Sequence, residues 1–200
     1  MAGAVQTDSS NAVPRMAAPA VAALLERAFA ADAAFKEHAA HVAKLSVRVG
    51  RELGLAGRAL ELLELAAAVH DVGKLTLAPE IIAKPGELDE QEWAAIRRHP
   101  TAGAELLEPC RVPPEVLEIV RSHHERWDGT GYPDGLSGER IPLGARIIAA
   151  VDAYCAMVEA RPYRAPRKPA AALAELLAGA GTQFDAACAR AAYRVTAVAA

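Results

Sequence analysis

The sequence has few aromatic residues, no long apolar run and no strong net charge. Phe, Trp and Tyr make up only 4% of its 200 residues, although apolar residues make up 52%. A core must therefore be built mainly from Ala, Leu and Val, and Ala and Leu favour helices. No apolar run approaches the roughly 20 residues that span a bilayer. The net charge of −3 gives no general reason to bind a nucleic acid polymer or a membrane surface.

The cysteines and the start of the chain indicate the compartment. Cys110, Cys155 and Cys188 are odd in number and show no paired spacing, which fits a reducing cytosol better than a disulfide framework. The mildly apolar stretch 16–25 has no basic start and is interrupted by Pro19, unlike a signal peptide. We predict a cytoplasmic protein.

The apolar periodicity predicts an all-α bundle of about seven to nine helices. Residues 1–15 lack periodicity and are expected to form a flexible tail. Residues 16–33 form a helix of undefined role, and residues 34–200 form the main domain. Asp89 and Glu92 form a candidate capping box. The spacing of apolar residues, Gly and Pro predicts helices over about 35–53, 57–70, 89–98, 100–107, 114–124, 143–159, 168–179 and 184–198.

Two segments do not follow a helical pattern. Residues 75–87 contain Pro and Gly and are predicted to be a connector. Residues 125–142 contain four glycines and two prolines, a length of loop that is usually functional or disordered within a compact domain. The embedded Trp127 and Tyr132 favour order.

The apolar pattern of the predicted helix 57–70 ends at His70 and Asp71. Burying a lone charge is costly, so the pair requires a partner, and a metal ion is one candidate. A solvated helix end is the alternative, because a His-Asp pair arises readily by chance. Gly73 is expected to close this helix in a left-handed conformation, which directs Lys74 back toward the same end.

Other polar residues share this setting at helix ends. Asp152 lies inside an otherwise apolar helix, so its carboxylate needs a cation or several donors; the residues alone leave open whether that cation is a metal ion or a Lys or Arg side chain. Helix ends can converge on one site in a bundle. Five histidines lie at or near predicted helix starts or ends: His38, His70, His99, His123 and His124.

Five histidines and two aspartates suit two first-row metal ions in mixed nitrogen and oxygen coordination. This set favours iron, manganese, cobalt, nickel or zinc over a purely oxygen-ligated magnesium. Paired metals are typical of phosphate ester hydrolysis, because they stabilise the attacking and leaving oxygens. Lys74, Arg161 and Arg164 could hold a phosphate, and the planar Arg fork grips phosphate oxygens bidentately.

In this order the residues resemble the HD-GYP family, the HD-domain phosphohydrolases that cleave the bacterial second messenger cyclic di-GMP. The resemblance covers about residues 35–195 and is strongest in His-His-Glu-Arg-Trp-Asp-Gly-Thr-Gly-Tyr-Pro. The matching segments are His70-Asp71-Val72-Gly73-Lys74, His99-Pro100, residues 123–133, Asp152 and Arg161-Pro162-Tyr163-Arg164.

The resemblance implies an HD-domain helical bundle with the Gly-rich loop at a two-metal active site. One metal would be held by His38, His70, Asp71 and Asp152. Asp71 would bridge to a second metal held by His99, His123 and His124. Lys74, Arg161 and Arg164 match positions that contact substrate phosphates, and Asp71 and Lys74 match catalytic positions. Gly131, Tyr132 and Pro133 match the segment tied to substrate access and partner contacts.

Three positions depart from the family pattern. Members with three metals carry Glu where this chain has Ala34, so we expect two metals. Many relatives have a second Asp where this chain has Cys155, which should still border the site because positions three apart share a helix face. A neutral thiol lacks the proton-transfer capacity of an acid. His41 stands where the family often has Arg, and we expect a structural role for it.

The resemblance implies a phosphodiesterase that opens cyclic di-GMP to linear pGpG, with cleavage onward to GMP left open. Iron or manganese is the expected metal, with cobalt, nickel or zinc as alternatives. A diguanylate cyclase of the GGDEF type is an expected partner for the Gly131-Tyr132-Pro133 segment, and a homodimer is compatible with the sequence. Two alternatives are a binding or adaptor module with decayed hydrolysis, and a general HD-type nucleotide phosphohydrolase.

Overall fold

The structure is a computed structural model that describes residues 19–31, 33–84, 86–160 and 165–197. These residues contain ten α-helices, three short 3-10 helices and no strand, apart from one isolated bridge between Ala180 and Phe184. One α-helix is a single turn, so nine are longer than a turn. This confirms the predicted all-α bundle.

The helices follow the predicted order closely. The α-helices are α1 (Pro19–Ala31), α2 (Ala33–Glu52), α3 (Arg58–Val69), α4 (Pro79–Ile82), α5 (Glu90–Arg97), α6 (His99–Leu107), α7 (Pro114–Ser122), α8 (Leu143–Val158), α9 (Pro169–Ala178) and α10 (Ala186–Ala197). The 3-10 helices are η1 (Val72–Thr76), η2 (Glu108–Cys110) and η3 (Gly138–Arg140).

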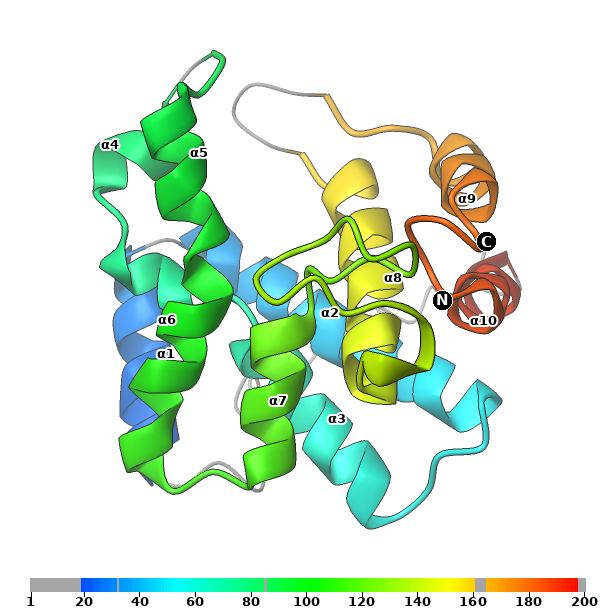
Figure 1. The fold of residues 1–200 in the computed structure, drawn as a ribbon, viewed down its shortest axis with the longest axis horizontal. Coiled ribbons are helices and arrows are strands. Elements are labelled where there is room, and N and C mark those ends of the chain that lie inside the picture. Colours follow the sequence, from blue (N-terminus) through cyan, green and yellow to red (C-terminus); the bar gives the residue numbers. More distant parts are fainter. Residues whose placement is uncertain (1–18, 32, 85, 161–164, 198–200) are drawn as a thin grey trace, which may run out of the picture.

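Helix α8 stands in the middle of the molecule, with α1, α4, α5 and α6 on one side and α9 and α10 on the other (Figure 1). It packs against α2, α7, α9 and α10, while α2 packs closely against α3. Helices α2, α3 and α7 therefore surround the apolar faces of α8 from several directions. Figure 1 also shows the loop after α7 crossing in front of α8.

The core consists largely of small and aliphatic side chains, as the composition predicts. In α3, Ala66, Ala67 and Ala68 are fully or almost fully buried beside Leu63 and Leu65. Small residues on one helix allow its neighbours to approach closely, and interiors pack as densely as organic crystals. Close packing of α3 against α2 and α7 thus places the C-terminal end of α3 deep inside the molecule.

Helix α1 joins this core. It packs against α2 and η1 and buries Val21, Leu24, Leu25 and Ala28. The predicted tail, residues 1–15, lies outside the described residues. None of the described helices is long and apolar enough to cross a membrane.

The predicted connector at residues 75–87 is partly wrong. It contains the end of η1 and the single turn α4, because Pro79 occupies the first turn of a helix, where its missing N–H has no intrahelical role. The predicted capping box is confirmed. The Glu92 N–H donates to Asp89 Oδ1 at 2.9 Å, and the Asp89 N–H donates to Glu92 Oε2 at 2.8 Å.

Candidate metal centre

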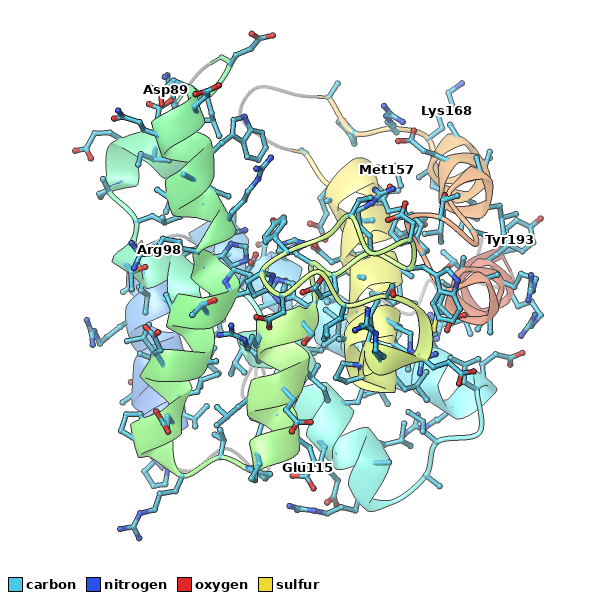
Figure 2. All side chains as sticks on the ribbon, in the orientation of Figure 1. Asp89, Arg98, Glu115, Met157, Lys168 and Tyr193 are labelled. Atoms are coloured by element: carbon cyan, nitrogen blue, oxygen red, sulfur yellow. The ribbon has the colours of Figure 1, made fainter. Side chains whose placement is uncertain are left out.

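The candidate metal centre lies where the inner ends of several helices meet. Figure 2 labels Asp89 at the outer end of α5 and Glu115 at the outer end of α7, and from these points both helices run inward. All seven predicted metal ligands come from elements that converge here: His38 on α2, His70 at the C-cap of α3, Asp71 between α3 and η1, His99 at the start of α6, His123 and His124 after α7, and Asp152 on α8.

The ligands fall into two groups, each with its candidate ligand atoms within 4.8 Å of one another. The first group, which we call the carboxylate half, is His38, His70 and Asp152. The second, the histidine half, is Asp71, His99, His123 and His124. This grouping matches the division into two metal sets that the family resemblance implies.

Asp71 lies between the two halves. Its Oδ2 is 3.5 Å from His70 Nε2 in the carboxylate half. Its Oδ1 is 3.1 Å from His99 Nε2 and 3.9 Å from His123 Nε2 in the histidine half. One oxygen of the same carboxylate therefore faces each group, an arrangement suited to a bridging ligand.

Three histidines are oriented by the carbonyl three residues before them. The Nδ1–H of His70 donates to Ala67 O at 2.8 Å, that of His99 to Ile96 O at 2.7 Å, and that of His123 to Val120 O at 2.6 Å. These carbonyls belong to last turns of helices, where oxygens lack intrahelical donors. The bonds fix the tautomer and leave each Nε2 free to bind a metal.

The donor atoms fit divalent metal ions. His70 Nε2 is fully buried without a hydrogen-bond partner, and Asp71 Oδ1 also has none. His99 Nε2 and His123 Nε2 lie only 3.3 Å apart. Unpartnered buried polar atoms are costly, so this concentration of inward-facing nitrogens and oxygens favours a bound cation. Imidazole with carboxylate is the donor set of first-row transition metals.

Burial holds three of the imidazoles, those of His70, His123 and His124, in the neutral form that binds metals. It lowers the pKa of His124 to about 4 and, with the neighbouring histidines, lowers the pKa of His123 well below its usual value. The pKa of His70 is also lowered by burial. Neutral imidazole is the ligand form.

At His38 and Asp71, neighbouring polar and charged groups outweigh burial. Burial by itself lowers the pKa of His38, but hydrogen bonds with Asp152 and Glu159 outweigh it and raise the pKa to about 9. Burial raises the pKa of Asp71, yet the charges of Lys74 and His70 outweigh this and hold it well below its usual range. The His38 Nε2 lies 2.9 Å from Asp152 Oδ1.

The predicted left-handed role of Gly73 is wrong. Gly73 does not have a positive φ, because α3 ends at His70 and the chain tightens into η1. Glycine is needed there for space. A Cβ on Gly73 would overlap His99 O and lie 2.6 Å from Gly103 N. Gly73 thus allows η1 to pack directly on α6 and brings Asp71 beside His99.

Lys74 points back to the helix end, as predicted. Its Nζ lies 2.5 Å from Asp71 Oδ2, and its side chain is 35% exposed. A cation that reaches both the bridging carboxylate and solvent is well placed to meet an incoming anion. Arg161 and Arg164, the other predicted phosphate contacts, lie outside the described residues.

The Gly-rich loop is ordered, as Trp127 and Tyr132 predict. Trp127 N–H donates to Gln183 O at 3.2 Å, and the Tyr132 N–H donates to His124 O at 3.3 Å. Gly131 packs so closely that a Cβ would lie 2.6 Å from His124 O. The Tyr132 ring lies 5.0 Å from the His124 ring. The predicted segment Gly131-Tyr132-Pro133 therefore borders the histidine half.

Some neighbours of the site were missed by sequence reasoning. A pocket of about 140 Å³ is lined by residues that include His123, His124, Asp152, Gln183 and Phe184. The Gln183 and Phe184 segment reaches the loop from the far end of the chain, and no local pattern in the sequence predicted this proximity.

Cys155 does border the site, as its spacing from Asp152 predicts. It is fully buried on α8, and burial raises the pKa of its thiol. Together with His41 and Glu159 it forms a third group whose candidate ligand atoms lie within 4.8 Å of one another. Glu159 was not predicted; its signal is the seven-residue, two-turn spacing from Asp152 on α8.

Comparisons with known proteins agree with the fold and the motifs. A family model described as HD domain matches residues 23–188. The chain is 44% identical over 158 residues to the cyclic di-GMP phosphodiesterase response regulator RpfG of Xanthomonas campestris, covering 78% of this chain and 41% of that protein. It is 37% identical over 161 residues to the 3'3'-cGAMP-specific phosphodiesterase 2 of Vibrio cholerae, covering 78% and 31%.

A solved structure supports the same fold. Bd1817, an HDG"Y"P protein from Bdellovibrio bacteriovorus, matches with a TM-score of 0.67 at 20% identity, covering 80% of this chain and 51% of that chain. The chain spans about two fifths or less of the length of the two curated relatives. The match of the HD domain model to most of the chain confirms the predicted resemblance: this chain belongs to the HD domain family.

Proposed function

We propose that this chain is a metal-dependent phosphodiesterase that opens cyclic di-GMP to the linear dinucleotide pGpG. The observation that carries the proposal is the pair of ligand groups that share Asp71. Two such groups suit two divalent metal ions, iron or manganese being the first candidates and cobalt, nickel or zinc the others. His38, His70 and Asp152 would hold one ion, and His99, His123 and His124 would hold the second, with Asp71 between the two ligand groups.

The bound metals supply Lewis acidity for the attacking and leaving oxygens of the phosphodiester. The protein contributes orientation and charge. Asp71 fixes the spacing of the two ligand groups, because each of its oxygens faces one of them. Lys74 extends from Asp71 toward solvent and offsets the charge that develops on the phosphate. Arg161 and Arg164, by their match to the family motif, hold the second phosphate of the substrate.

The substrate is a cyclic dinucleotide, and cyclic di-GMP is our first choice. The name of the Xanthomonas relative supports cyclic di-GMP, whereas the name of the Vibrio relative supports the mixed 3'3'-cGAMP. Competition between the two dinucleotides for one enzyme, with GMP as a third competitor, separates a cyclic dinucleotide phosphodiesterase from a general nucleotide phosphohydrolase.

The test is to purify the protein anaerobically with Mn²⁺ or Fe²⁺ and to follow linear product by chromatography. We expect pGpG, and continued incubation shows whether GMP follows. His70→Ala should abolish product formation. Absence of product with every metal, at protein concentrations well above substrate, would falsify the proposed activity.

Cys155 favours a second candidate, a binding or adaptor module with decayed hydrolysis. Its thiol is buried and, with a raised pKa, neutral, so it cannot replace a carboxylate in proton transfer. Tight binding of cyclic di-GMP without turnover, unchanged in Cys155→Asp, would support the adaptor. A gain in turnover in Cys155→Asp would support an enzyme slowed by this residue.

We further propose the bounds of the catalytic domain, its compartment and its partners. Residues 34–200 form the catalytic domain, in the cytoplasm, where cyclic dinucleotides act. The Gly131-Tyr132-Pro133 segment provides a contact for a diguanylate cyclase, because it is half-buried against the site and still reaches the surface. A pull-down with wild-type protein and with a variant of this segment tests the contact, and light scattering tests for a homodimer.

A further inference from the structure

His38 is oriented by a different kind of partner from His70, His99 and His123. Its Nδ1 lies 2.8 Å from Glu159 Oε2, a carboxylate 121 residues away in sequence. The other three use a carbonyl three residues back along their own chain segment.

The difference follows from where His38 sits in its helix. His70 and His123 are C-cap residues of α3 and α7, and His99 follows the end of α5, so carbonyls of a last turn, which lack the usual intrahelical donor four residues ahead, lie beside them. His38 lies in the second turn of α2 (Ala33–Glu52). Carbonyls there accept the N–H four residues ahead. An acceptor for the Nδ1–H of His38 must therefore come from another element.

That element is the C-terminal end of α8. Glu159 is the C-cap of α8, and its N–H donates to Cys155 O at 3.0 Å, which fixes its backbone. Its Oε2 meets His38 Nδ1, and its Oε1 lies 2.8 Å from His41 Nδ1. His38 and His41 are one turn apart on α2, so a single carboxylate spans both imidazoles.

We propose that Glu159 is a positioning residue for the metal ligand His38, and that His41 holds Glu159 in place. This inference rests on the proposed metal site. A carboxylate that accepts the Nδ1–H of a ligand histidine fixes its tautomer, orients its Nε2 and increases its basicity. Here the Nε2 is directed at Asp152 Oδ1, 2.9 Å away.

The exposed fractions of the three side chains predict how strongly removal of each partner of His38 affects metal binding. The His38 side chain is 11% exposed, that of Glu159 26% and that of His41 44%. Water cannot readily replace Glu159 at the buried His38, whereas it can replace His41 at the rim. Loss of Glu159 should therefore weaken the carboxylate half more than loss of His41 does.

The experiment is a calorimetric titration of the metal-free full chain with Mn²⁺, which separates two binding steps. His38→Ala identifies the step that belongs to the carboxylate half. Glu159→Ala should weaken that step by about ten- to a hundred-fold and leave the other unchanged. Glu159→Gln should recover part of the loss, because its amide oxygen still accepts from His38, and His41→Ala should have a smaller effect. Glu52→Ala, which removes a surface glutamate paired with Arg194, is the matched control and should change neither step.

Unchanged affinity in Glu159→Ala, or an equal loss in both steps, would overturn the proposal. So would a third bound ion in the wild type that Glu159→Ala removes, because Glu159 would then be a direct ligand together with His41 and Cys155. The titration needs no turnover. An inactive protein that shows the predicted split would contradict the proposed activity and support the positioning role.

Discussion

The two halves of the metal centre hold similar ligands by different means. In the histidine half, His99 and His123 are oriented by carbonyls of their own helix ends, and burial keeps His123 and His124 neutral. In the carboxylate half, His38 is oriented by Glu159 from a distant helix and interacts with Asp152. The histidine half depends on local backbone geometry. In the carboxylate half His70 also uses a local carbonyl, but His38 depends on the packing of α2 against α8.

This contrast indicates which half tolerates change in its surroundings. A backbone carbonyl cannot be removed by substitution, so the orientation of His99 and His123 is secure as long as the helices form. The carboxylate of Glu159, in contrast, is lost in most single amino-acid substitutions at this position. Metal binding in the carboxylate half should therefore vary more readily among variants of this chain.

Removal of the shared ligand should have the largest effect. In Asp71→Ala both halves lose a carboxylate, so we expect metal content to fall in both and turnover of cyclic di-GMP to drop by at least about a thousand-fold, equivalent to several kcal/mol of transition-state stabilisation. Metal analysis and product formation measure this. Asp89→Ala, which removes only a helix cap, should leave both metals bound. Retention of two metals in Asp71→Ala would show that the halves do not depend on a bridge.

Removal of one ligand from each half should separate them. His123→Ala should weaken only the metal of the histidine half and His38→Ala only that of the carboxylate half, each by more than about 100-fold, since even indirect partners of ligands contribute ten- to a hundred-fold. Stepwise Mn²⁺ titration distinguishes the two losses. If either variant loses both metals, the halves fold and bind as one unit.

Gly73→Ala should disturb the junction of the halves. The added methyl group would overlap His99 O and crowd Gly103, and overpacking of this kind costs about 1 to 3 kcal/mol. At about 2 to 4 °C per kcal/mol for a chain of this size, the shift in Tm is measurable. Gly54→Ala, at a φ of 86° with open space around it, is the control for strain without a clash. Asp71 should lose its position beside His99 only in Gly73→Ala, seen as weaker metal binding.

The stability of the metal-free protein should depend on pH with opposite signs at His124 and at His38. The lowered pKa of His124, about 4, means that the unfolded chain binds a proton first as pH falls below about 6.5, so the free energy of unfolding decreases between pH 6.5 and 4. The raised pKa of His38, about 9, contributes stability below pH 6.5 that is lost between pH 6.5 and 9. Each contribution is at most about 3 kcal/mol.

Urea unfolding from pH 4 to 9, in the presence of a chelator, measures the free energy of unfolding on both the acid limb below pH 6.5 and the alkaline limb above it. His38→Gln should remove much of the alkaline loss and retain the acid loss. An unchanged alkaline limb in this variant would assign that limb to another group.

Most of the helices could be predicted from the sequence, because helix periodicity and the Gly, Pro and capping residues at helix ends are local features. The capping box at Asp89 and Glu92 was predictable from spacing, and the order of the Gly-rich loop from its aromatic residues. The single turn α4 was missed, because a four-residue helix carries too few residues to show a period. For Gly73 the need for glycine was recognised but the reason was wrong, since a close approach of η1 to α6 leaves no mark in the local sequence.

The sequence by itself determined the helical class and the types of the candidate ligands, and through the family motifs it predicted their division into two sets. These properties follow from composition, helix periodicity and motif order, which depend only on the order of residues in the chain. Only the tertiary structure decided that Asp71 directs one oxygen to each half, that Gly73 is required for space, and that Glu159 orients His38. The reason is physical: such contacts depend on how helices distant in sequence pack, and the His38–Glu159 contact joins residues 121 positions apart.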